Sequence, residues 1–405
     1  RTVAICAAGD YAEGGAWDGS VSNRVYLTTS GKNAQYVRFK GAGAGLSTIH
    51  GQLDLTSEGH SEDGLGPAAM RCVRFDQGCF QGFTLTEGRS RETNDNKEWD
   101  HGGAVFCGNT DGTVADCVIT NCAATRGGAT WNARLYRCRI SGIILGAVRY
   151  AKCFACIADH NPINKADTGA LTSGCDVWHC TAVGDSTDRG GINANSDMNV
   201  YNTIGYVGTA LGGYLSTLWH GSIVWGFKSY GGTDGVGHVR ADPLFRDVAN
   251  GDYRVLSCSP ALTCGEFYDT YWSDYTTDYY GNPILFVDGK PLAGAVQTIA
   301  PGVFVSSAQN YGITSVTNGV SVDPGESVTI TASDSLRPVA GLEVDGTYFP
   351  GLRSYTYTAP ALADLKPCGT FVKAVYPTAL YVNPDPTVGS DDNDGFSPES
   401  PLLTF

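Results

Sequence analysis

A turn of small residues followed by a short apolar strand recurs along roughly the first 240 residues of the chain. The first glycines of successive turns lie 25, 19, 23, 21, 22 and 19 residues apart, a mean of about 21.5. Glycine suits such turns because a residue with positive φ avoids a steric cost only when it lacks a Cβ atom. The turns are Gly102-Gly103, Gly127-Gly128, Gly146-Ala147, Gly169-Ala170, Gly190-Gly191, Gly212-Gly213 and Gly231-Gly232.

A second strand follows each of the first six turns and carries Cys, Thr or Ser at one position. A period near 21 residues with two or three short strands predicts one coil of a parallel β-solenoid, stacked at about 4.8 Å. The small side chains would form an interior ladder in which free thiols pack as small hydrophobes. Disulfides between neighbouring coils remain an alternative. The ladder positions are Cys117, Cys138, Cys156, Cys180, Thr203 and Ser222.

The glycine period stops after Val296, and short alternating strands separated by Pro and Gly turns begin. Strands at a spacing of roughly 8–12 residues are typical of a small β-sandwich or meander. The sequence therefore predicts an all-β chain with a β-helix over residues 1–296, a β-sandwich-like module over 297–377 and a separate segment over 378–405. The predicted strands of the module are Val303–Val305, Gly312–Val316, Ser327–Thr331, Leu342–Val344, Tyr355–Thr358 and Thr370–Tyr376.

Composition and charge narrow the classes of partner. The chain has 53 Gly in 405 residues and a formal net charge of −14. Because nucleic acids and anionic lipids attract basic surfaces, neither is an expected partner. No apolar run reaches the roughly 18 residues of a membrane span. The chain starts at Arg1 without a leader-like stretch, so we expect a processed or excised piece of a protein that acts outside the cell or at its surface.

Two motifs resemble a known family. The stretch HGGAVFCGNTDGTVADCVITNCAATRGGATWNARLYRCRISG, from His101 to Gly142, is similar to the right-handed parallel β-helix repeats of secreted bacterial proteins in the pectate-lyase-like superfamily. ADPLFRDVANGDYRVLSCSPALTCG, from Ala241 to Gly265, resembles the closing segment of the same family. The resemblance implies a right-handed coil over residues 1–296. Cys264 stands where the family has Asp, and we predict that it forms a disulfide with Cys258 across a short loop.

The segment from Tyr311 to Tyr376, with DPGESVTITA, LEVDGTYF, YTYTAP and FVKAVY, resembles the internalin-type bacterial repeat module. That resemblance implies a spacer or adhesion domain.

The last segment, LYVNPDPTVGSDDNDGFSPESPLLTF from Leu380 to Phe405, resembles the opening of a β-helix protein, which leads into a cap and the first coil. Residues 1–11 resemble the strand that normally follows such a cap, so we expect an uncovered first coil that invites strand addition. The last segment could cover it in trans on another copy, begin a tandem β-helix, or fold back in cis. We favour the first two equally. The expected intersubunit residues are Tyr381, Val382, Leu402, Leu403 and Phe405.

Candidate chemistry is sparse, and nucleophile-elbow, zinc-helix and nucleotide-loop motifs are missing from the sequence. The charged insertion GRSRETNDNKEWDH, from Gly88 to His101, predicts either a solvated loop, which we favour, or a carbohydrate contact. The acidic run SDDNDG predicts either a hydrated turn or a Ca²⁺ site. The carbohydrate-contact candidates are Lys97, Trp99, Asp100 and His101, and the calcium-ligand candidates are Asp391, Asp392 and Asp394.

Two further groups of residues have open roles. A ladder of charges that includes Lys152, Asp159 and His160 would suit a lyase if its members shared one face. The aromatic-acidic cluster from Tyr268 to Tyr280 predicts a cover for the last coil, or a contact surface for carbohydrate or protein.

Taken together, these patterns favour an extracellular structural or adhesive protein that joins copies of itself, or a tandem domain, head to tail. The alternative is a secreted polysaccharide lyase or glycoside hydrolase that acts on an acidic glycan. No cofactor is expected apart from the Ca²⁺ alternative.

Overall fold

The computed structural model describes residues 2–27, 37–92, 98–144, 146–161, 171, 174–184, 192, 198–210, 218–229, 233–268, 276–301, 303–307, 320–332, 339–361, 371–376 and 381–390. These residues form two compact units. The first comprises residues 1–243 and 260–298, and the second comprises 244–259 and 299–405. No helix among the described residues is both long and apolar enough to cross a membrane.

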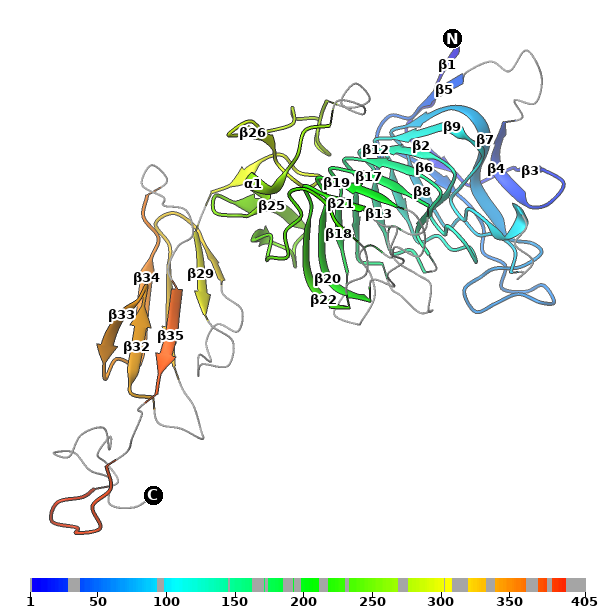
Figure 1. Ribbon diagram of the computed structural model, residues 1–405. Helices are drawn as coiled ribbons and strands as arrows, with labels where there is room; N and C mark the ends of the chain where they lie inside the picture. The colour runs from blue at the N-terminus through cyan, green and yellow to red at the C-terminus, as the bar shows by residue number, and fades with distance from the viewer. Residues whose placement is uncertain are drawn as a thin grey trace. The chain divides into compact units, whose positions relative to one another are not determined.

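The first unit is a parallel β-helix, as the glycine period predicts (Figure 1). Its described residues form two long sheets in which the strands along each main path pair in parallel with the corresponding strands of the next coil, while β3 (Ala16–Trp17) and β4 (Ser22–Leu27) form an antiparallel pair at the side of one sheet. Strands of the nine-stranded sheet lie in the order β2 (Gly9–Tyr11), β6 (Ser47–His50), β8 (Thr84–Thr86), β10 (Val118–Thr120), β13 (Arg139–Ser141), β16 (Ile157–Asp159), β18 (Thr181–Val183), β20 (Ile204–Ala210) and β22 (Ile223–Ser229).

The second sheet of this unit has fourteen strands among the described residues. Its main path is β1 (Thr2–Ile5), β5 (Val37–Lys40), β7 (Met70–Gln81), β9 (Val105–Ala115), β12 (Arg134–Tyr136), β15 (Lys152–Phe154), β17 (Asp176–Trp178), β19 (Asn199–Tyr201), β21 (Leu218–His220) and β23 (Thr233–Asp234). Beside it lie β3 (Ala16–Trp17), β4 (Ser22–Leu27), β11 (Thr130–Trp131) and β14 (Val148–Arg149). The unit also contains a 3₁₀ turn at Glu98–Asp100, the short helix α1 (Ala261–Cys264), β26 (Phe286–Val287) and β27 (Lys290–Pro291).

The turn glycines have the backbone geometry that their spacing predicts. Gly102, Gly127 and Gly146 have φ values of 64°, 63° and 24°. A Cβ atom on Gly103 would lie 2.4 Å from the carbonyl oxygens of Ala123 and Gly128. Neighbouring coils therefore approach each other through glycine backbone, which explains why glycine recurs once per coil.

The predicted interior ladder is confirmed where Cys and Thr of neighbouring coils meet. The Cys156 N–H donates to the Cys180 sulfur at 3.4 Å, and the Cys180 N–H donates to Thr203 Oγ1 at 3.1 Å. The Thr203 N–H in turn donates to Ser222 Oγ at 3.1 Å. Cys180, Thr203 and Ser222 thus each accept a backbone N–H from the preceding coil, which satisfies a buried donor.

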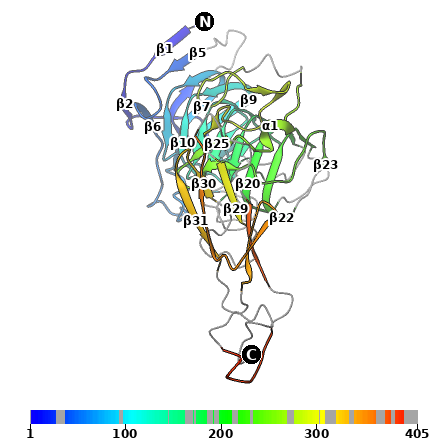
Figure 2. The same cartoon turned by 90° about the vertical axis from the view of Figure 1, so that its left-hand side faces the viewer.

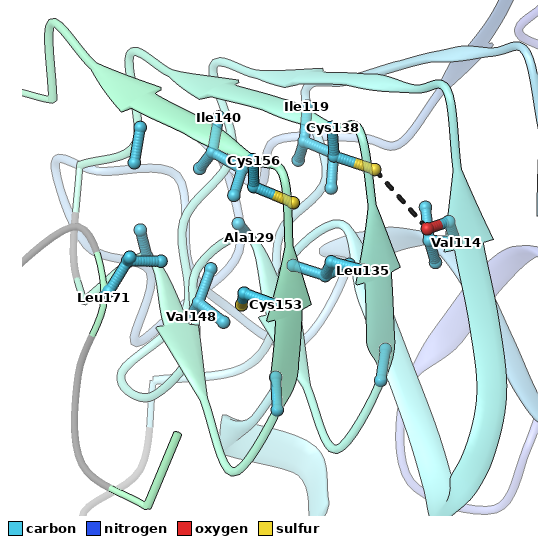
Figure 3. Packing of buried hydrophobic residues seen from close by; sticks show 14 of the residues in the cluster. Val114, Ile119, Ala129, Leu135, Cys138, Ile140, Val148, Cys153, Cys156 and Leu171 are labelled. Atoms are coloured by element: carbon cyan, nitrogen blue, oxygen red, sulfur yellow. Dashed lines mark hydrogen bonds between the residues drawn. The ribbon is translucent and has the colours of Figure 1, made fainter. Parts of the chain in front are cut away.

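The thiols of the ladder lie inside one continuous apolar core (Figure 3). Cys138 and Cys156 lie beside Ile119, Leu135 and Ile140, and the Cys138 thiol donates to the Val114 carbonyl oxygen at 3.4 Å. Burial raises the pKa of Cys117, Cys138 and Cys156 well above the usual thiol value. The packing role predicted for these cysteines is therefore the one the structure shows.

A second ladder stands on the outer face of the fourteen-stranded sheet. It consists of Tyr136, Phe154, Trp178, Tyr201 and His220, whose rings stack in sequence with centroids 4.8, 4.6, 5.8 and 5.0 Å apart. Residues that follow α1 cover it, because Ile284 packs against Phe154 and Trp178. Beside it, buried His179 contacts Asn202 and Gln297 through its two ring nitrogens, at 3.1 and 3.3 Å.

The second unit is a small sandwich with its own core. Its larger sheet has the order β30 (Val320–Val322), β29 (Val303–Ser307), β35 (Phe371–Val375), β32 (Gly341–Val344) and β33 (Thr347–Pro350) among the described residues, and β31 (Ser327–Thr331) pairs with β34 (Ser354–Thr358). Ile330, Leu342 and Val372 lie at the centre of its core. The predicted strand Gly312–Val316 lies outside the described residues.

The unit boundary differs from the predicted one at the closing motif. Residues 244–259 belong to the second unit, where β24 (Phe245–Asp247) and β25 (Asp252–Leu256) form a small sheet with β28 (Ile299–Ala300). The reason is that β25 pairs with β28 rather than with the stacked coils, through the register Val255 to Ile299. The motif does not continue the two long sheets, as a simple coil repeat would.

Candidate functional site

The first coil presents the outer edge of both long sheets. Strand β1 pairs with β5, and β2 pairs with β6; no other described strand pairs with either. Figures 1 and 2 both show β1 outermost, beyond β5. The Cys6 N–H donates to the Lys40 carbonyl oxygen at 2.8 Å, so this residue's backbone faces β5. Because backbone groups alternate along a strand, those of Val3 and Ile5 face the open edge.

Burial at this end falls off gradually. Along one inward-facing column of the nine-stranded sheet, Tyr11 is only partly buried, whereas Ile49 and Leu85 are 3% and 0% exposed. In the other sheet Phe39 is partly buried and stacks on buried Phe80 at 4.9 Å. The outward-facing Ile5 is 83% exposed. The end of the rod is therefore an apolar surface with free strand edges among the described residues, which is the geometry that strand addition requires.

The predicted intersubunit and calcium residues fall mostly beyond the described part of the chain. Tyr381 and Val382 are described and are 43% and 37% exposed. Leu402, Leu403 and Phe405 lie outside the described residues, as do Asp391, Asp392 and Asp394. Among the residues that the structure describes, no three His, Cys, Asp or Glu side chains are grouped so that they could hold a metal ion.

The charged insertion is anchored at its end rather than solvated throughout. Lys97 lies outside the described residues, but Trp99, Asp100 and His101 are described. The fully buried Arg71 donates to the carbonyl oxygen of His101 at 2.9 Å and to that of Glu98. For Asp100 and His101 the favoured prediction of a solvated loop is therefore wrong, because both are buried and a buried guanidinium binds this backbone; Glu98 is exposed, as predicted.

Asp18 holds this anchor in place. Its carboxylate lies 2.6 Å from Arg74 and 3.3 Å from Arg71, and its side chain is fully buried. Burial alone would raise the pKa of Asp18, but hydrogen bonds from Ser20, Val21 and Arg74 keep it below its usual value. Burial lowers the pKa of Arg71 to about 10, so the guanidinium remains charged at neutral pH. The cluster ties the first coil to the insertion.

Two of the predicted carbohydrate contacts form a pair that is buried instead of exposed. Asp100 is fully buried, and its Oδ1 lies 2.9 Å from Nε2 of His101. Neither carboxylate oxygen of Asp100 accepts a hydrogen bond from the residues described here. The His101 ring stacks on the Trp131 ring with centroids 3.6 Å apart. Asp100 is thus not a surface contact, and His101 connects the insertion to an aromatic side chain on β11.

Trp131 belongs to a further set of side chains that the sequence did not single out. We call Trp131, Arg149 and Tyr150 the aromatic-arginine cluster. The Arg149 Cζ atom lies 5.9 Å from the Trp131 ring centroid and 5.5 Å from that of Tyr150, and the two rings meet edge to face at 4.9 Å. The register explains this assembly, because β9, β11 and β14 align Phe106, Trp131 and Arg149 on one outward-facing column.

A second arginine has a similar setting. The Arg91 Cζ atom lies 4.9 Å from the ring centroid of Trp17, which is 52% exposed. Among the described residues neither Arg91 nor Arg149 makes an ion pair, and the Nε atom of each is buried without a hydrogen bond. Their guanidinium groups are held by aromatic faces instead of carboxylates.

The charges proposed for a lyase do not share one face. Lys152 is on β15 of the fourteen-stranded sheet, whereas Asp159 is on β16 of the nine-stranded sheet. Asp159 is fully buried and pairs with Arg139 at 2.7 Å and with His160 at 3.4 Å. These contacts account for Asp159 as a structural ion pair, and the predicted line of charges is wrong for these residues.

The predicted disulfide is also wrong. No bond joins Cys258 to Cys264. Cys264 ends helix α1, where its thiol is buried and donates to the carbonyl oxygen of Gly221 at 3.3 Å. Burial raises the pKa of the Cys264 thiol to about 12. The thiol therefore packs against the coil ahead of it, as the other interior thiols do.

The aromatic-acidic cluster from Tyr268 to Tyr280 is described only in part. The Tyr268 ring meets Tyr201 and His220 edge to face, at 4.6 and 5.5 Å. It therefore extends the cover of the outer aromatic ladder. Residues 269–275 lie outside the description.

Comparisons with known proteins do not assign the chain to a family. No protein-family model matches the chain, and no curated protein is significantly similar to it in sequence. The fold defines a class, a parallel β-helix followed by a small β-sandwich unit. Among the described residues, the first-coil edge has strand backbone without a strand partner, and the aromatic-arginine cluster has a buried Nε atom without a hydrogen bond.

Proposed function

We propose that this chain is an extracellular structural and adhesive module that accepts a β-strand at its first coil. The observation that carries the proposal is the edge of β1, where the backbone groups of Val3 and Ile5 have no strand partner among the described residues. A strand edge beside exposed apolar side chains binds another strand through main-chain hydrogen bonds. We propose that this edge is the acceptor end of the module.

The donor is the segment from Leu380 to Phe405, whose sequence resembles the opening of a β-helix protein. Donated in trans, it joins the end of one copy to the first coil of the next. Such a contact is heterologous, and unless the rotation closes into a ring it builds a filament. As the start of a tandem β-helix, the same segment joins modules within one polypeptide. Both arrangements give a linear array of rods, in keeping with the spacer or adhesion role that the internalin-type resemblance implies.

The acidic net charge and the burial of the free thiols are both compatible with a location outside the cell. The acidic net charge of −14 opposes binding to nucleic acid. The ladder thiols are buried, and the raised pKa values of Cys117, Cys138 and Cys156 keep these three in the unreactive thiol form. Free cysteines of this kind are protected by packing in an oxidising medium.

The experiment compares the chain of 405 residues with one truncated after residue 379. Sedimentation velocity over a range of concentrations and negative-stain electron microscopy report the size and shape of the assemblies. We expect the full chain to form linear oligomers that grow with concentration, and the truncated chain to stay monomeric. A synthetic peptide of residues 380–405 should bind the truncated chain, as read by fluorescence anisotropy. Assemblies that persist unchanged after truncation contradict donation by this segment.

A further inference from the structure

The two open edges of the first coil lie beside charges of opposite sign. Val3 of β1 lies opposite Arg38 of β5. Ile5 lies opposite Lys40 in the same pair of strands, and all four side chains are exposed. On the edge of the nine-stranded sheet, β2 carries Asp10, whose side chain is 76% exposed. A strand that approaches β1 therefore meets positive charge, and one that approaches β2 meets negative charge.

The two cations beside β1 are not neutralised by carboxylates. Among the described residues neither Arg38 nor Lys40 makes an ion pair, and Arg38 donates a hydrogen bond to the neutral side chain of Gln81. Arg137 on a later coil is matched instead, because its Nε atom lies 2.6 Å from Oδ1 of Asp116. Unmatched exposed cations attract an anionic partner over about 10 Å at about 0.1 M salt.

The edge at β2 has the reverse arrangement. Asp10 Oδ1 lies 3.6 Å from His50 Nε2, and Glu87 Oε2 lies 3.0 Å from His50 Nδ1. The nearby Arg24 donates to the backbone carbonyl oxygen of His50 at 2.7 Å, so the group keeps a net negative charge when His50 is neutral. A strand rich in carboxylates is repelled here, since like charges on neighbouring strands destabilise their pairing.

The segment from Leu380 to Phe405 is acidic. It contains five Asp and Glu residues and no Lys, Arg or His. Residues 391–405 lie outside the described part of the chain, so their charge is taken from the sequence. Residues 1–51 contain five Lys and Arg against three Asp and Glu, although the whole chain has a net charge of −14. The two ends that a head-to-tail contact joins are therefore opposite in charge.

We propose that an acidic strand adds to β1 and not to β2, and that Arg38 and Lys40 select it. The occupant is the segment Leu380–Phe405 of a second copy, so this inference rests on the proposed function. An added strand lies about 9.6 Å from β5, which is two strand spacings. A lysine stem and a carboxylate side chain together bridge that distance along the outward face.

Charge selection sets the orientation of the copies. Two acceptor ends repel each other, as do two donor segments, so the head-to-tail contact is the one that brings opposite charges together. Exposed charges are screened by salt, and the Debye length falls from about 10 Å at 0.1 M to about 3 Å at 1 M. Ionic strength therefore regulates the assembly.

Sedimentation velocity of the full chain at neutral pH, in about 0.1 M and about 1 M NaCl, tests the proposal. The charge-reversed acceptor carries Arg38→Glu and Lys40→Glu. We expect its dissociation constant for self-association to rise about ten- to fiftyfold at the lower salt concentration, because attraction becomes repulsion at two exposed positions. The difference from the unmodified chain should shrink at the higher concentration, where salt effects on apolar contacts are common to both chains.

A second reversal tests rescue. Asp391→Lys with Asp392→Lys reverses two charges of the donor segment and should also weaken assembly. Combined in one chain with the charge-reversed acceptor, it should restore assembly, which structural damage by either set of substitutions would not do. The matched control is Arg254→Glu with Lys290→Glu, which changes the net charge equally at residues that are 40% and 45% exposed outside the first coil. The control should assemble like the unmodified chain.

Two proline variants identify the edge. Ile5→Pro removes an open backbone donor from β1. Asp10→Pro removes the corresponding donor from β2, because the Gly9 N–H donates to Leu46 and the next residue faces the other way. We expect Ile5→Pro to abolish assembly and Asp10→Pro to leave it unchanged. Assembly that is lost in Asp10→Pro and kept in Ile5→Pro overturns the proposal.

Failure of this inference and failure of the proposed function give different results. If Ile5→Pro abolishes assembly but the charge-reversed acceptor assembles like the unmodified chain, strand addition stands and charge selection is wrong. If the combined reversal fails to restore assembly, charge selection is also wrong. If the unmodified chain itself stays monomeric at both salt concentrations, the proposed function fails and this inference fails with it.

Discussion

The Cys180 N–H donates a hydrogen bond to Thr203 Oγ1 at 3.1 Å, from one coil of the rod to the next. The same hydroxyl donates to the carbonyl oxygen of Tyr201 at 2.9 Å, and so the side chain of Thr203 satisfies two backbone groups at once. Cys180 and Thr203 are both fully buried, so the first of these hydrogen bonds is shielded from solvent. At three successive turns a backbone N–H is thus accepted by a small side chain of the next coil, namely Cys180, Thr203 and Ser222.

The first prediction concerns this ladder. Thr203→Val keeps the shape of the side chain but removes the acceptor, which leaves the Cys180 N–H buried without a partner. We expect a loss of about 1–3 kcal/mol in the free energy of unfolding, measured by urea titration. Thr203→Ser keeps the hydroxyl and should lose less. Equal losses for the two variants would mean that the hydrogen bond contributes nothing.

Thiol reactivity gives the second prediction. The described thiols of the β-helix core are buried, and burial raises the pKa of several of them, for example to about 11 in Cys107. Because the thiolate is the reactive form, these cysteines should react with a thiol reagent only after unfolding. Cys6 on the first coil is partly exposed and should react in the native state. Rapid native labelling of Cys117, Cys138 or Cys156, detected by peptide mass spectrometry, would contradict the closed core.

The anchor of the charged insertion leads to the third prediction. Asp18→Asn keeps the side chain's shape but removes the charge that neutralises Arg71 and Arg74. Removing one partner of a buried ion pair costs about 3–5 kcal/mol, so we expect a large fall in the free energy of unfolding. Glu98→Gln removes an exposed partner of Arg74 and should cost less than about 1 kcal/mol. A mild effect of Asp18→Asn would show that the anchor is weak.

The fourth prediction is a pH dependence from His179. Burial lowers the pKa of this histidine to about 3, below the ordinary value of 6.5. The unfolded chain therefore takes up a proton that the folded chain does not, as the pH falls below 6.5. Stability is fully present above that pH and declines by at most about 1.4 kcal/mol per pH unit down to about pH 3.

His179→Asn tests the source of this slope. Asparagine tolerates the left-handed backbone of this position, where φ is 46°, and it does not titrate. We expect urea titrations between pH 4 and 7 to show a shallower decline for the variant than for the unmodified chain. The same decline in both would assign the acid sensitivity to other groups.

The parts of the fold that recur in every coil were the parts that the sequence could predict. The spacing from Gly102 to Gly146 and the aligned Cys and Thr residues indicated a stacked rod. Successive coils need the same tight turn and the same acceptor for a buried backbone N–H, so the same residue types recur. Strand pairing between Phe106, Trp131 and Arg149 could not be predicted in this way. Outward positions of a strand carry no hydrophobic signature, and their alignment depends on insertions of unequal length between coils.

Contacts between distant segments explain most of the remaining differences. Gln297 contacts His179 across 118 residues of sequence, and no local pattern indicates such a pair. The charged insertion was predicted to be solvated because its charged residues are close together in sequence. The sequence does not indicate that Arg71, which lies on a different strand, binds its backbone. One signal for the aromatic-arginine cluster was present, since Phe106 and Trp131 each stand four residues after a turn glycine and Arg149 stands three after another.

The most direct test of the central claim is a single substitution at the open edge. The N–H of Ile5 faces away from β5, and its side chain is 83% exposed, so Ile5→Pro removes an edge donor with little loss of native pairing. Ile5→Thr keeps the donor and is the matched control. We predict that sedimentation velocity shows linear oligomers for the unmodified chain and for Ile5→Thr, and monomers for Ile5→Pro with an unchanged melting temperature. Oligomers of the same size in a folded Ile5→Pro chain would contradict strand addition at the first coil.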